Sequence, residues 1–133
     1  TLWRATLAAN PDCAVGHRNL AIELLDAHRT NEAIPHLEAA VRIRPDYFGA
    51  LSDLGAAYLE TGRLSEAMTA LNRAVQLSPK DALVHHNLGL LYAQLRQYDE
   101  AILHCRRALE CDPNFQPAQD TLNRILRARR GSP

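Results

Sequence analysis

Hydrophobic residues recur three and four positions apart along most of the chain, which is the spacing of one face of an α-helix. Two such stripes follow one another between residues 88 and 109. They consist of Leu88, Leu91, Tyr92 and Leu95, and then of Tyr98, Ile102, Cys105, Ala108 and Leu109. Because the stripes are separated by a short polar stretch, the pattern predicts two amphipathic helices joined by a turn.

The same pattern returns at a fixed period. The stretch NLGLLYAQLRQYDEAI, which begins at Asn87, resembles DLGAAYLETGRLSEAM, which begins at Asp53, so that 87 − 53 = 34. Four prolines keep the same spacing, since 45 − 11, 79 − 45 and 113 − 79 all equal 34. A constant period predicts a tandem array of helix pairs. The predicted units are 14–47, 48–81 and 82–115, with the end of a preceding repeat at 1–13 and a capping helix and tail at 116–133.

Glycine, small polar residues and proline mark the expected helix ends. Gly62 lies where a left-handed residue would end the first helix of a pair. One equivalent position just after the turn has Asn31, Ser65 and Asp99 in the three units. These residue types are typical helix N-caps. The prolines of the series should end each second helix, since the residue before a proline avoids helical geometry. Pro35 lies early in its helix, so we expect it to be tolerated.

The residues at fixed positions match a known repeat. The second unit carries Leu51, Leu54, Gly55, Tyr58, Gly62, Ala67, Leu71, Ala74 and Pro79. This series resembles the tetratricopeptide repeat, a 34-residue helix-turn-helix unit. The resemblance implies an all-α fold, an α-solenoid in which helix pairs stack into a right-handed superhelix with a concave groove.

The resemblance also implies which residues line the groove. In the family, the first helix of each pair faces it with the second, sixth, ninth and twelfth positions of the repeat, which we call groove positions. We expect binding residues among them at Val15, Asn19, Ile22, Asp53, Ala56, Leu83, Asn87 and Leu90.

The groove position at the sixth residue of the repeat is polar in every unit, with Asn19, Asp53 and Asn87. An asparagine side chain both donates and accepts hydrogen bonds, so a ladder of asparagines can bind the backbone of an extended peptide. The arrangement resembles the asparagine ladder in the repeats of O-GlcNAc transferase. Asp53 departs from it, because an ionised carboxylate only accepts and prefers a backbone N–H or a basic partner. The alternative is that these residues are simply the polar side of an exposed helix.

Other groove residues argue against one known ligand of the family. The carboxylate clamp of its chaperone-binding members needs Lys or Arg together with Asn, and Arg18 is the only basic residue at the equivalent positions. Recognition of a chaperone C-terminal carboxylate is therefore not expected.

Composition and charge exclude several classes of function. Fifteen Lys and Arg balance fifteen Asp and Glu, which gives no overall attraction to nucleic acid or to an anionic membrane. Four of the six histidines share repeat positions two units apart, as His17 with His85 and His36 with His104, and the three cysteines form no C-x-x-C pair, so we expect no metal. No catalytic constellation is evident, and we expect neither enzymatic activity nor a cofactor.

The sequence thus predicts a scaffold that binds a peptide segment of a partner protein. The first alternative is a self-assembly module, which would use the open N-terminal end around Leu2, Trp3 and Leu7. The second alternative rests on the stretch TLWRATLAANPDCAV, which resembles the boundary before the C-terminal repeats of multi-span glycosyltransferase-like membrane proteins. The chain would then present a substrate for such a parent. We expect a soluble domain in the cytoplasm, with the soluble end of a membrane protein as the alternative.

Overall fold

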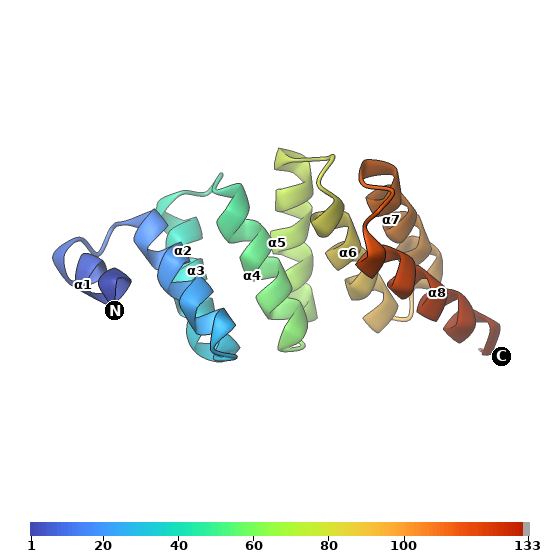
Figure 1. Cartoon of the computed structure of the whole chain (residues 1–133), viewed down its shortest axis with the longest axis horizontal. Helices are drawn as coiled ribbons and strands as arrows, with labels where there is room; N and C mark the ends of the chain where they lie inside the picture. The colour runs from blue at the N-terminus through green and yellow to red at the C-terminus, as the bar shows by residue number, and fades with distance from the viewer. Residues whose placement is uncertain (132–133) are drawn as a thin grey trace. The chain divides into compact units, whose positions relative to one another are not determined.

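The computed structural model describes residues 1–131, and these form eight helices without a strand (Figure 1). The final two residues of the predicted tail, 132–133, lie outside the described part. The helices are α1 (Leu2–Ala9), α2 (Ala14–Asp26), α3 (Thr30–Ile43), α4 (Phe48–Glu60), α5 (Leu64–Leu77), α6 (Ala82–Gln94), α7 (Tyr98–Cys111) and α8 (Gln116–Gly131). The all-α class predicted from the sequence is confirmed.

The chain divides into two compact parts, residues 1–70 and 71–133. From here on, "first unit" and "second unit" refer to these two parts, and the 34-residue units of the sequence are called repeats. In the first unit, α1 packs on α2, α2 on α3, and α3 on α4. In the second unit, α6 packs on α7, and α8 contacts both of them. These helices therefore pack mainly on their neighbours in sequence, as expected for tandem helix pairs.

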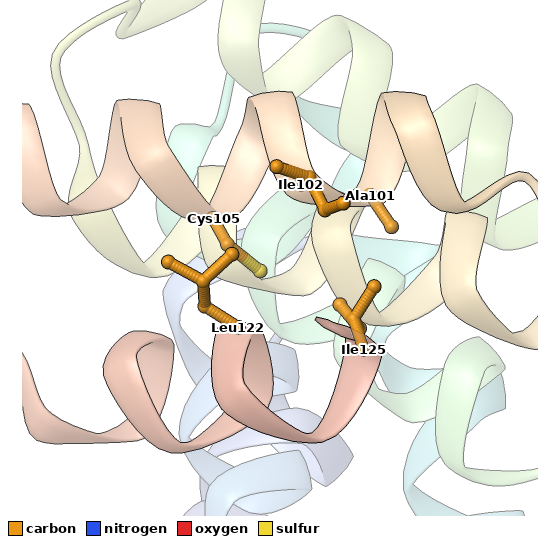
Figure 2. Close-up of a cluster of buried hydrophobic side chains, with 5 residues drawn as sticks. All are labelled: Ala101, Ile102, Cys105, Leu122 and Ile125. Carbon is orange, nitrogen blue, oxygen red and sulfur yellow. The ribbon is translucent and has the colours of Figure 1, made fainter. Parts of the chain in front are cut away.

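Small and apolar side chains fill the contacts between helices. The alanines that repeat along the second helices are fully buried, namely Ala33, Ala40, Ala67, Ala74, Ala101 and Ala108. In the second unit, Ala101, Ile102 and Cys105 of α7 face Leu122 and Ile125 of α8 (Figure 2). The capping helix thus covers the apolar side of α7 with its own apolar stripe.

The turns within the helix pairs explain where one prediction was wrong. Gly62 has the expected left-handed conformation (φ +76°), and His28 and Arg96 adopt it at the equivalent positions (φ 59° and 58°). In each turn the following N–H returns to the first helix, as in the bond from Gln97 N to Tyr92 O at 2.9 Å. This closure is tight, and the next helix begins at once.

Asn31, Ser65 and Asp99 consequently lie inside the first turns of α3, α5 and α7 and are not N-caps. The N-cap residues of α3 and α7 are Arg29 and Gln97, and neither makes a side-chain capping bond. Pro35 is tolerated as predicted, because α3 continues through it to Ile43.

Candidate functional site

The predicted groove residues differ in how far they are exposed. Val15 and Leu83, which share the second repeat position, are 43% and 50% exposed. Asn87 is only 6% exposed. The other five predicted residues, Asn19, Ile22, Asp53, Ala56 and Leu90, have intermediate exposure. Large apolar surface at the second position is thus open to solvent in both units, whereas Asn87 is largely covered.

Asp53 is bound within the first unit. Arg18 of α2 donates from Nε to Asp53 Oδ2 of α4 at 2.8 Å. The guanidinium lies against Gly49, where an added Cβ would stand 2.7 Å from Arg18 Cζ. The same Cζ atom is 5.7 Å from the ring centre of Tyr47. Glycine at position 49 therefore gives Arg18 the room to reach Asp53.

The environment of Arg18 keeps it charged. Burial alone would lower the pKa of the guanidinium, but the hydrogen bond and charge of Asp53, followed by Tyr47, raise it overall. The basic partner expected for Asp53 is thus a residue of the chain itself. The carboxylate is occupied without any peptide.

An equivalent contact occurs in the second unit with different chemistry. His86 has the same repeat position as Arg18, and its Nε2 lies 2.9 Å from Thr121 Oγ1 of α8. Its ring meets that of Phe115 edge-on, with centres 5.5 Å apart, where Arg18 has Tyr47. Each contact joins residues 35 apart, since 53 − 18 and 121 − 86 both equal 35. We call these two contacts rungs.

The rung of the second unit is buried, and its Thr121 also accepts a hydrogen bond from Arg124. His86 and Thr121 are both buried, and His86 Nδ1 has no hydrogen-bond partner in the described chain. Arg124 donates from Nη2 to Thr121 Oγ1 at 3.2 Å. Burial first, and then the charge of Arg124, lower the pKa of His86, so the ring is neutral at pH 7.

Beside Arg124 lies a depression of about 320 Å³ formed by α6, α7 and α8. Its apolar wall includes Leu90, Ala93, Tyr98 and Ile125, and its polar side includes Thr121 and Arg124. Leu90 was predicted as a groove residue. Sequence analysis missed Thr121 and Arg124, although they have the sixth and ninth positions of the 34-residue frame in the capping helix.

The histidines form two pairs that repeat 68 residues apart. The Nδ1 atoms of His17 and His36 are 3.1 Å apart, and those of His85 and His104 are 3.3 Å apart. His85 Nε2 also lies 2.7 Å from the carbonyl oxygen of Pro79. Because a carbonyl only accepts, His85 carries its proton on Nε2, and His104 donates from Nδ1. Residues 1–131 contain no group of three or more potential metal-ligating side chains.

Cys105 has the environment of a packing residue. It is fully buried between α6 and α8, and its sulfur would lie 2.7 Å from a Cβ added at Gly89. Burial raises the pKa of the thiol to about 11. The thiolate form is therefore scarce at neutral pH, and Cys105 serves as an apolar packing residue of the stripe identified in the sequence.

Comparison with known families decides what these helix pairs are. Two family models, both described as tetratricopeptide repeat, match residues 24–86 and 82–115. The chain belongs to the tetratricopeptide-repeat family. The second match spans the same residues as the helix pair α6 and α7 with its flanking turns.

Solved structures of other tetratricopeptide-repeat proteins have the same fold. The structure of MamA matches with a TM-score of 0.89 at 24% identity, over 96% of this chain and 74% of that one. YrrB, described as a protein of this class with an unusual peptide-binding site, matches with a TM-score of 0.82 at 20% identity over 98% and 67%. The first repeat domain of Spaghetti (RPAP3), bound to the HSP90 peptide SRMEEVD, matches with a TM-score of 0.83 at 21% identity over 89% and 94%.

No curated protein matches the sequence. Within residues 1–131, none of the helices combines the length and the apolar character that a membrane crossing requires.

Proposed function

We propose that this tetratricopeptide-repeat chain is a protein-interaction scaffold that binds a peptide segment of a partner at its groove positions. The observation that carries the proposal is the exposure of Val15 and Leu83 at the same repeat position. An exposed aliphatic residue recurs at this position in α2 and α6, whereas α4 between them has Gly49 there. A peptide that covers either residue would remove its apolar area from water.

Similar structures support this type of ligand. YrrB is described with a peptide-binding site, and the Spaghetti domain with a bound peptide. Ile22, Ala56 and Leu90 extend the apolar surface at the ninth position, while Asn19 offers an amide that can hydrogen-bond a peptide backbone. We therefore propose apolar anchoring at the second and ninth positions, with polar contact at Asn19.

The covered polar residues have a smaller part in this proposal. Asp53 already accepts from Arg18, and Asn87 has little surface left for a ligand. A contact from either to a peptide would require local rearrangement. Asn19 is the sixth-position residue best suited to a direct test.

The experiment is selection of peptides from a random display library by the purified chain. We expect Leu83→Ser and Val15→Ser to reduce enrichment strongly, because each removes an exposed apolar contact. Leu103→Ser is the matched control, since Leu103 of α7 is 46% exposed but does not have a groove position. Equal enrichment by the native chain, Leu83→Ser and Leu103→Ser would contradict the proposal, as would the absence of any enriched peptide.

A second candidate function is assembly through α1. This helix has no buried residue, and Leu2 is 70% exposed. Self-association should appear as a mass that rises with concentration in analytical ultracentrifugation. Leu2→Ser should abolish the rise, and a constant monomer mass for the native chain would exclude this candidate.

A further inference from the structure

The depression beside Arg124 combines an apolar wall with a cation that has no carboxylate partner among residues 1–131. Arg18 is paired with Asp53, and Arg129 of α8 donates from Nη2 to Asp99 Oδ1 at 2.9 Å. Arg124, by contrast, makes no ion pair among residues 1–131, and its one hydrogen bond is to a neutral hydroxyl. A guanidinium has five N–H donors, so most of its hydrogen-bonding capacity is available to a ligand.

The position of this guanidinium is fixed by its neighbours. Thr121 Oγ1, which receives the Arg124 bond, is itself within hydrogen-bond distance of the buried His86. Thr121 is 3% exposed. A side chain held by a buried partner loses less freedom when it binds a ligand, so Arg124 is partly preorganised.

Charge around the depression favours an acidic ligand. The second unit carries nine Lys or Arg and six Asp or Glu, and 9 − 6 = +3. Most of this excess is in α8, where four arginines accompany one aspartate. Arg124 is the charged residue among those that line this depression, so the depression attracts carboxylates.

We infer that the depression binds an internal acidic segment of a partner protein, with an aliphatic side chain against Leu90, Ala93 and Ile125 and an adjacent Asp or Glu on Arg124. The inference rests on the proposed function, because it names the chemistry of the peptide at one end of the groove positions. Arginine suits a carboxylate in particular, since its fork can donate two parallel hydrogen bonds. The apolar wall adds the requirement for an aliphatic neighbour.

The test uses a random peptide library displayed between two folded domains, so that no peptide has a free C-terminal carboxylate. The native chain should enrich peptides in which an aliphatic residue adjoins Asp or Glu. Arg124→Gln should still enrich peptides but lose the acidic preference. Arg127→Gln is the matched control, because it removes one charge from α8 at a residue that faces a different depression, with Asn123, Leu126 and Arg130.

Synthetic peptides then measure the effect. The most enriched acidic peptide should lose about tenfold in affinity when its acidic residue becomes Gln, and a similar factor when the protein carries Arg124→Gln. Combining the two changes should cost little more than either alone, since both remove one contact. Arg124→Lys, which keeps the charge without the fork, should bind the acidic peptide with intermediate affinity.

The outcomes separate this inference from the proposed function. An unchanged acidic preference in Arg124→Gln, alongside normal peptide enrichment, overturns the inference and leaves the proposed function standing. Enrichment of purely apolar peptides by the native chain has the same meaning. Failure of the native chain to enrich any peptide overturns both. Circular dichroism of each variant checks that the helices are intact.

Discussion

The two units place different chemistry at the same point of the repeat. In the first, a charged rung joins Arg18 to Asp53 at a partly exposed site. In the second, a neutral rung joins His86 to Thr121 in the interior, and the cation Arg124 lies beyond it. The comparison shows that the same 35-residue spacing can join different polar side chains. It therefore does not determine which polar groups remain available to bind a ligand. In the first unit the cation is neutralised internally, and in the second it faces a depression.

The largest effect should come from breaking the buried rung. Thr121→Val keeps the shape of the side chain but removes the hydroxyl that His86 and Arg124 both contact. His86 would then be buried without a partner at either ring nitrogen, because Nδ1 already lacks one. We expect the free energy of unfolding to fall by about 1 to 3 kcal/mol.

Chemical denaturation of the two forms measures this loss. Thr69→Val is the control, because the Thr69 hydroxyl is exposed and bonds only to the carbonyl of Ser65 in its own helix. A Thr121→Val variant as stable as this control would show that the neutral rung contributes nothing, and the contrast between the units would then rest on Arg124 alone.

The rungs also mark where prediction from sequence stopped. The 34-residue period and the helical spacing of the apolar residues were sufficient to predict the helix pairs, because this pattern recurs once in every repeat and follows local rules. A rung joins residues of consecutive 34-residue repeats, and its partners depend on how the helices of those repeats pack together. The need of Asp53 for a basic partner could be predicted, but Arg18 as that partner could not.

Two further features of the structure could not be predicted from the sequence. Asn87 has the same repeat position as Asn19, yet Asn87 is buried and Asn19 has intermediate exposure, because burial depends on the neighbouring side chains and not on register alone. The N-cap prediction failed for a local reason, since the next helix begins two residues after the left-handed residue of each turn, whether that residue is Gly62 or His28. Composition alone does not reveal that His28 takes this geometry.

The histidine pairs offer a second way to compare the units, this time through a feature they share. Burial, with smaller contributions from His85 and Arg107, lowers the pKa of His104 to about 4. The unfolded chain takes up this proton near pH 6.5. The pair should therefore contribute its full stability above pH 6.5 and lose it as the pH falls toward 4. Because His104 is only half-buried, we expect a loss of about 1 to 2 kcal/mol.

The middle repeat supplies the control for this pH dependence. It has Leu51 and Ala70 at the two positions of the pair, both of them buried. The double variant His85→Leu, His104→Ala places the same two apolar residues at the equivalent positions of the second unit. Thermal unfolding between pH 7 and pH 4 should show a shallower decline for the double variant, while parallel curves would assign the acid sensitivity to other groups. His36, whose pKa is lowered by burial and by His17, should leave a remaining slope.

The smallest effect on stability should come from the charged rung. Asp53→Asn removes the ion pair with Arg18 but keeps a hydrogen-bond acceptor, and a partly exposed pair contributes only about 0.2 to 1 kcal/mol. The loss should shrink in high salt, because screening weakens the native pair. Asp26→Asn, which changes an exposed residue of α2, controls for the altered net charge.

The same variant sharpens the comparison between the units. Without Asp53, Arg18 becomes a cation with no carboxylate partner beside the exposed Val15, which is the combination that Arg124 and Leu90 already present in the second unit. Asp53→Asn should therefore enrich additional acidic peptides that the native chain does not select, and Val15→Ser should remove them again. If the double variant Asp53→Asn, Arg124→Gln selects no acidic peptides, an unpaired arginine beside an apolar wall is not enough, and the fixed position that Thr121 gives Arg124 becomes the decisive difference.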